Sequence, residues 1–164
     1  MSLPRLSIWM GALLFLSACS QYQLGSGSQE IRRIEILPVR NSASIPGIHG
    51  VLQQALVTTL NTDKRIRLEP GDETLEVEIT GYTRKAVTRS TTDALEAGQF
   101  RVSLIAVCTL NSKDKQKVRF AQRTFTATAI LAAAGDLSAE ERQVLPRLAT
   151  EIATQIRDAS VGSW

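Results

Sequence analysis

The sequence has very little of the side-chain chemistry on which most catalytic and metal sites depend. Its 164 residues include one histidine, His49, and two cysteines, Cys19 and Cys108. A single histidine cannot supply a multi-histidine metal site, and its position at the start of a helical stretch is typical of a solvated side chain. Gly25 and Gly27 lie in a polar stretch and not between a strand and a helix, so they do not form a phosphate-binding loop. We therefore predict a protein that is not an enzyme and holds neither a metal nor a cofactor.

Excess charge is also scarce. The chain has 19 Lys and Arg residues against 16 Asp and Glu residues, a formal net charge of +3, and no block of basic residues. This balance gives no reason to expect nucleic acid as a partner. The apolar run near the N-terminus, Ile8–Leu16, falls short of the roughly 20 residues that a transmembrane helix needs.

The N-terminus carries the clearest signal in the sequence. Arg5 precedes the apolar run, and Leu16-Ser17-Ala18-Cys19 closes it, in the order of a secretory signal peptide and its cleavage site. A cysteine directly after Leu-Ser-Ala resembles a bacterial lipobox, in which the peptide is cut before the cysteine and the thiol is acylated. We predict that Cys19 is the lipidated first residue of the mature protein. The alternative is an ordinary signal peptide that ends by chance in a cysteine.

The predicted anchor divides the chain into three parts. Residues 1–18 form the signal peptide, residues 19–30 the acylated cysteine with a flexible Gly/Ser-rich tether, and residues 31–160 the folded domain. Removing residues 1–18 from the 164 leaves 146, enough for one domain with a sizeable core. Because Cys19 is acylated in this prediction, Cys108 has no partner and is expected to be a buried free thiol. Ser20, in place of Asp, is compatible with export to the outer membrane.

Two stretches have the period of an amphipathic helix. The first runs from Pro46 to about Leu60. The second opens with a capping box at Ser138 and continues to about Asp158. Pro146 lies inside the second stretch and has no backbone N–H, so we expect the helix to kink or restart there.

Four strands are expected, at about residues 33–38, 75–80, 100–110 and 118–129. In the third, Ile105 and Val107 oppose a second apolar row, which suggests burial on both faces. The apolar register of the fourth slips, which fits a β-bulge near Ala121–Arg123. Residues 84–98 are polar and are interpreted as the end of a strand and a long hairpin loop. The resulting order β-α-β-β-β-α predicts an α+β sandwich, with two helices on one face of a four-stranded mixed sheet.

The mature chain resembles the lipopolysaccharide-assembly lipoproteins, the LptE-like partners of the LptD outer-membrane barrel. Besides the lipobox, the resemblance rests on stretches of the tether, the first strand and helix, the second strand and the last helix, in order and at similar spacing. These are Tyr22–Gly25, Ile34–Asn41, Pro46–Gly47, Leu75–Arg84 and Leu148–Ala153. The matching region extends from Cys19 to Asp158. The absence of a basic residue in Ala132–Gly135 and the presence of Pro146 depart from the family's pattern.

The resemblance implies a function that the residue pattern alone does not give. Such proteins are anchored in the outer membrane, plug the barrel from the periplasmic side, help it to assemble and contact lipopolysaccharide. A basic residue of the hairpin region has this lipid contact in the family, and the nearest candidates here are Arg84, Lys85, Arg89 and Arg101. Arg89 is the first choice among them. These cations could equally be solvated side chains that keep the domain soluble or face acidic groups of the barrel wall.

A second hypothesis of a different class stays open at this point. The chain could be a periplasmic lipoprotein scaffold that binds peptidoglycan or a secretion channel. Co-purification with a large barrel after detergent extraction would distinguish the two hypotheses.

Overall fold

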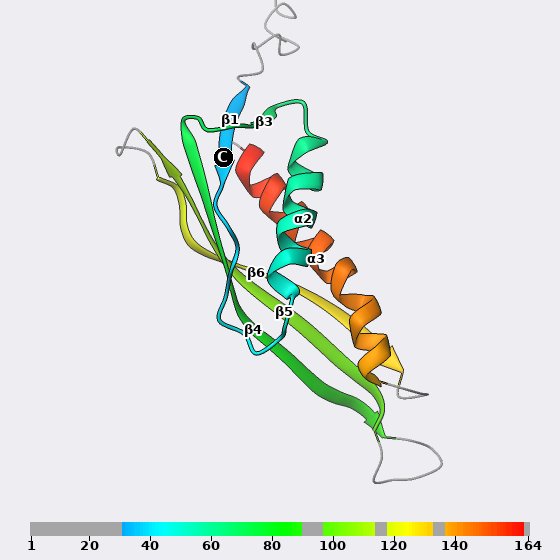
Figure 1. Cartoon of the computed structure of the whole chain (residues 1–164). Coiled ribbons are helices and arrows are strands. Elements are labelled where there is room, and N and C mark those ends of the chain that lie inside the picture. The colour runs from blue at the N-terminus through cyan, green and yellow to red at the C-terminus, as the bar shows by residue number, and fades with distance from the viewer. Residues whose placement is uncertain (1–30, 90–96, 114–117, 133–136, 163–164) are drawn as a thin grey trace, which may run out of the picture. The chain divides into compact units, whose positions relative to one another are not determined.

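Six strands and two helices make up the part of the chain that the computed structural model describes, which is residues 31–89, 97–113, 118–132 and 137–162 (Figure 1). In chain order they are β1 (Arg32–Ile36), β2 (Arg40–Asn41), α2 (Ile48–Asn61), β3 (Ile66–Leu68), β4 (Glu73–Arg89), β5 (Ala97–Ser112), β6 (Val118–Ala132) and α3 (Leu137–Val161).

All six strands belong to one mixed sheet in the order β3-β1-β4-β5-β6, with β2 added beside β4. Strand β1 is parallel to both β3 and β4, whereas β4–β5 and β5–β6 are antiparallel. The predicted α+β class, with two helices and a mixed sheet, is confirmed. The predicted number of four strands is wrong, because β2 and β3 have two and three residues. Segments this short are too brief to produce a visible alternation.

Strands β4 and β5 are much longer than the sequence predicted. They have 17 and 16 residues and pair from Glu73 opposite Ser112 to Arg89 opposite Ala97. The interpretation of residues 84–98 as mainly loop is therefore wrong, and only residues 90–96 lie outside the described part. This end of the β-ribbon has little apolar cover, so its residues are mostly polar on both faces. A strand in such a stretch lacks the alternation of apolar and polar residues by which it could be recognised.

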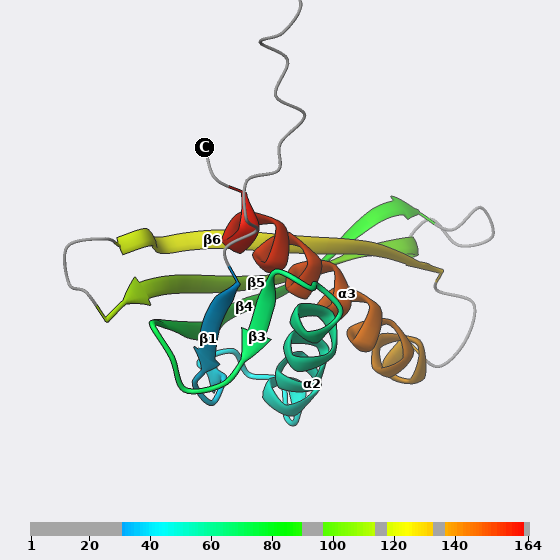
Figure 2. The ribbon, with the colours of Figure 1, turned by 90° about the horizontal axis from the view of Figure 1, so that it is seen from above.

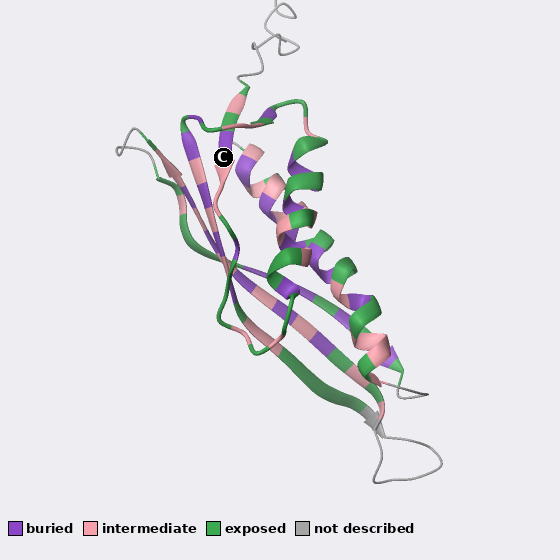
Figure 3. Cartoon of the chain, viewed as in Figure 1, coloured by how far each residue is buried: buried purple, intermediate pink, exposed green. Residues whose placement is uncertain are grey.

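Both helices pack on the same face of the sheet, here called the inner face (Figure 2). On β5, every second residue from Val102 to Leu110 is fully buried beneath them, while Ile105 and Val107 on the outer face are only half-buried. The predicted burial of β5 on both faces is therefore wrong for the outer face. No helix of the described residues covers that side, and the lower part of β4 is exposed in Figure 3.

The two helices begin close to the predicted positions. Helix α2 starts at Ile48 because Gly47 has a φ of 75°, a left-handed conformation that glycine adopts without the steric cost of a side chain. Helix α3 runs through Pro146 without restarting. The Pro146 carbonyl accepts a hydrogen bond of 2.9 Å from the Thr150 hydroxyl.

The predicted bulge in the last strand is confirmed. Cys108 pairs with Arg123 and Leu110 with Phe120, so β6 holds one more residue than β5 between these two pairs. Gln122 has a φ of 48°, and its backbone N–H donates to the Thr109 hydroxyl at 3.1 Å. The bulge brings Phe120 to the inner face together with Phe125, Ala127 and Ala129, whereas Val118, beyond a second register shift, is 54% exposed.

Gly71 allows the turn between β3 and β4 to pass directly over β1. A Cβ atom at this position would lie 2.2 Å from Arg33 Cβ and 2.8 Å from the Arg33 carbonyl oxygen. We predict that Gly71→Ala lowers the free energy of unfolding by about 1–3 kcal/mol, as other overpacking changes do, because backbone must move to remove the clash. Denaturant unfolding measures it.

Gly50→Ala is the matched control for this substitution. Gly50 lies in α2, and nothing would lie within 4 Å of its new Cβ atom. We expect stabilisation of about 0.5–1 kcal/mol, since alanine favours the helix. Equal effects of the two substitutions would contradict the close approach at Gly71.

Candidate functional site

The four basic residues singled out in the sequence lie at one end of the long β4–β5 ribbon, near the start of α3. Arg84, Lys85 and Arg89 belong to β4 and Arg101 to β5. The side chain of Arg89 is outside the described residues, so its role as first choice stays a prediction. The other three do not form one cluster, because Arg84 lies on the opposite face from Lys85 and Arg101.

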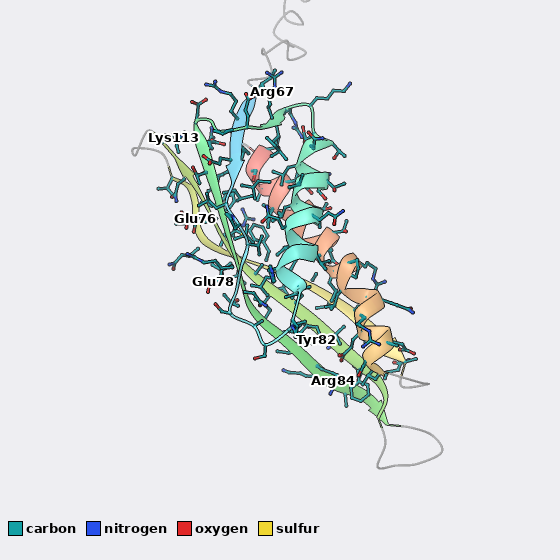
Figure 4. All side chains as sticks on the ribbon, in the orientation of Figure 1. Arg67, Glu76, Glu78, Tyr82, Arg84 and Lys113 are labelled. Atoms are coloured by element: carbon teal, nitrogen blue, oxygen red, sulfur yellow. The ribbon has the colours of Figure 1, made fainter. Side chains whose placement is uncertain are left out.

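Arg84 points to the inner face and is already paired. Its Nη1 lies 2.9 Å from Glu141 Oε1 of α3, and its guanidinium lies 5.7 Å from the centroid of the Phe100 ring. Figure 4 labels Arg84 and Tyr82 on this stretch of β4. Burial, together with the negative charge of Glu141, raises the pKa of Tyr82 to about 12, so this phenol stays neutral. The ion pair of Arg84 with Glu141 joins β4 to α3. The Arg84 guanidinium could bind a ligand only if this ion pair were broken.

Lys85 and Arg101 point to the outer face and lie directly opposite each other in the β4–β5 register. Both are exposed, and neither forms an ion pair within the described residues. Like charges directly opposite on neighbouring strands repel each other and destabilise the sheet. This arrangement leaves two cations side by side with no balancing anion among the described side chains. We call Lys85 and Arg101 the basic pair.

An apolar side chain adjoins the basic pair on the same face. Ile130 of β6 lies opposite Arg101 and is 55% exposed. Val87 of β4, at a register shift two residues after Lys85, is 41% exposed. Sequence reasoning missed Ile130, because the last strand was predicted to end at Ala129 and β6 continues to Ala132. Cations next to exposed aliphatic groups suit an anion that carries hydrocarbon, since each part finds a matching surface.

Acidic side chains occupy the other end of the outer face. Glu76 and Glu78 lie there on β4 (Figure 4), and Arg40 Nη2 approaches Glu78 Oε2 at 3.3 Å. Glu73, on the inner face, is buried and paired with Arg119 at 3.2 Å. Because of these acidic side chains, an anionic ligand is favoured more at the end of the outer face that holds the basic pair.

The other residues whose side chains could act as nucleophiles, acids, bases or metal ligands show no sign of such a role in the described part of the chain. His49 is exposed at the start of α2, away from the basic pair. Cys108 is a buried free thiol, as predicted, and burial raises its pKa to about 12, which makes it unreactive. The described residues contain no group of three or more His, Cys, Asp or Glu side chains that could hold a metal ion. Cys19 lies outside the described residues.

Neither helix in the described part of the chain is long and apolar enough to cross a membrane.

Comparison with known proteins gives one family match and several similar structures. The family model LptE, described as lipopolysaccharide-assembly, matches residues 31–160. Hypothetical protein CT253 from Chlamydia trachomatis has a TM-score of 0.55 at 11% identity, and the match covers 77% of this chain and 96% of that protein. Protein XCC0632 from Xanthomonas campestris also has a TM-score of 0.55, at 12% identity, and the match covers 82% of this chain and 88% of that protein. A search of curated proteins finds no match. At these identities the two structures show a shared fold alone.

Proposed function

The chain belongs to the LptE family of lipopolysaccharide-assembly lipoproteins, and from this we propose that it plugs an LptD-like outer-membrane barrel, assists its assembly and contacts lipopolysaccharide with its basic pair. In this proposal the acylated Cys19 anchors it to the outer membrane from the periplasmic side. Residues 19–30 give the domain enough reach to enter the barrel lumen.

The observation that carries the lipid contact is the juxtaposition of Lys85 and Arg101. Two cations that lie opposite each other are stabilised when an anion lies between them, and a lipopolysaccharide phosphate is such an anion. Arg101 can bind two phosphate oxygens with its planar guanidinium, and Lys85 adds a second charge. The neighbouring Ile130 offers apolar surface to the acyl chains of the same molecule.

Arg84 has a different role in this proposal from the one that its basic character first suggests. Its ion pair with Glu141 fixes the end of β4 against α3 and so orients Lys85 on the other face of the same strand. Lys85 and Arg101 are therefore the contacts, and Arg84 positions them.

We expect Lys85→Asp/Arg101→Asp to weaken lipopolysaccharide binding by the purified protein at least about tenfold, since a charge-assisted hydrogen bond contributes about 1.5–3 kcal/mol. The dissociation constant should be measured at low ionic strength, where exposed charges are least screened. The melting temperature should change little, because both side chains are exposed and the double variant replaces one like-charged pair with another.

Arg67→Asp/Lys113→Asp is the matched control. It makes the same change in net charge with two exposed cations at the other end of the sheet (Figure 4) and should leave binding nearly unchanged. Equal weakening by both double variants would mean that net charge alone drives binding. If the Lys85/Arg101 variant bound lipopolysaccharide as tightly as the unchanged protein, the basic pair would not be the lipopolysaccharide contact.

A further inference from the structure

The outer edge of β6 is unpaired within the described residues, because β6 is the last strand of the sheet. From Thr124 to Ala132 the edge carries nine residues without a charge or a proline. Folded proteins usually protect a free edge with charged residues, proline or a bulge. The bulge of β6 at Gln122 lies before this segment and leaves it unprotected. Such an edge is suited to pairing with another strand.

The backbone of this segment offers hydrogen-bonding groups outwards. Gln155 Nε2 of α3 donates to the Thr126 carbonyl at 3.1 Å, so the backbone of Thr126 points away from β5. Because direction alternates along an antiparallel strand, Thr124, Thr128 and Ile130 also present their N–H and C=O groups to the free edge. Within the described residues, Gln155 is the one side chain that satisfies any of them.

A groove of about 410 Å³ runs beside the end of this edge, between β6 and the first half of α3. Its α3 side carries Glu140, Gln143 and Arg147, which fall on one face of the helix by their spacing of three and four residues. Neither Glu140 nor Arg147 forms an ion pair within the described residues. These three side chains are in turn acidic, neutral and basic. In an antiparallel second copy of the helix, each charged residue would therefore face one of opposite charge.

We propose that a second copy of this chain docks here, pairing β6 with the partner's β6 antiparallel, about a two-fold axis that passes near Ile130 and Gln143. Glu140 then faces the partner's Arg147, and Arg147 faces the partner's Glu140. Thr128 lies opposite the partner's Ala132, with the free backbone groups of the two edges bonded to each other. The contact is the same patch on both copies, as a closed two-fold dimer requires.

The dimer leaves the outer face open, since the two sheets join edge to edge. The basic pair stays exposed, so this inference does not depend on the lipopolysaccharide contact. It describes a form of the protein outside the barrel, in which an uncharged edge that favours aggregation is covered.

A charge reversal across the axis tests the arrangement. The full chain is purified in detergent, and its mass is measured by light scattering over a concentration series. We expect a dimer whose dissociation constant rises at least about tenfold in Glu140→Arg and in Arg147→Glu, because each places like charges at both junctions. The double variant Glu140→Arg/Arg147→Glu should restore the dimer, since every junction again joins opposite charges. A destabilised helix would instead make the double variant worse than either single one.

Two further variants locate the axis and the edge. Ile130→Cys should form an intermolecular disulfide on mild oxidation, since two copies of residue 130 meet near the axis, whereas Thr124→Cys on the same edge should not. Thr128→Lys should abolish the dimer by placing a charge at the edge, while Thr83→Lys, on the same face of β4 away from the edge, should leave it intact. A monomer at every concentration, cross-linking through residue 124 in preference to 130, or single reversals without effect would each overturn the proposal.

Discussion

Replacing Cys19 with Ala should abolish both fatty-acid labelling of the protein and cleavage at this position. The described residues contain no helix that could cross a membrane. The formal net charge of +3 gives only weak electrostatic attraction to a bilayer surface. Anchoring then depends on the acyl chains, each of which contributes about 0.8 kcal/mol per buried methylene group. The variant should run as the uncut form, and incorporation of labelled palmitate measures the loss.

Cys108→Ala is the control, because it removes the other cysteine of the chain. Cys108 is fully buried and its thiol is held neutral by a raised pKa, so it cannot serve as an acylation site in the folded domain. This variant should keep full labelling and cleavage. Labelled fatty acid on Cys19→Ala would show that the lipobox interpretation is wrong.

The sequence predicted the parts of the fold in which one apolar period persists for many residues. Helix α2 buries Ile48, Leu52, Leu56 and Leu60, and their spacing is visible in the sequence. The bulge of β6 was also predictable, since Phe120 and Phe125 can share one face only with an extra residue between them. In both cases the inner face is fixed by contact with other apolar groups.

The direction of the basic residues could not be predicted in the same way. Leu75, Val77 and Ile79 face inwards, and simple alternation would then send Lys85 inwards and Arg84 outwards. A bulge between Ile79 and Gly81 reverses this order. No apolar pattern follows the bulge in this polar stretch, so the sequence gives no sign of the reversal. Only the three-dimensional pairing separates Arg84, bound to Glu141, from the exposed basic pair.

The free edge of β6 had no signal in the sequence either. An edge strand and a central strand both alternate between an inner and an outer face, and they differ in what lies beside their backbones. Strands β1 and β3 extend the sheet away from β6, since they pair in parallel on the far side of β4. Long-range pairing of this kind depends on chain topology, which local patterns do not encode.

The core between the helices and the sheet is where single substitutions should cost the most stability. Leu56 of α2 and Ile152 of α3 are both 0% exposed and belong to the same buried cluster as Leu104 of β5. This agrees with the sequence-based expectation that the two helices meet over the sheet. Truncation at either position leaves a cavity that the packed neighbours cannot fill.

We therefore expect Leu56→Ala and Ile152→Ala each to lower the free energy of unfolding by about 2–5 kcal/mol, the sum of lost burial and the cavity that remains. Val57→Ala is the matched control, since Val57 is the next residue of the same helix and is 43% exposed. It should change stability by at most about 0.5 kcal/mol, as surface substitutions usually do. Denaturant unfolding gives all three values under one set of conditions. A Val57 variant as unstable as the Leu56 variant would mean that α2 presents a different face to the sheet.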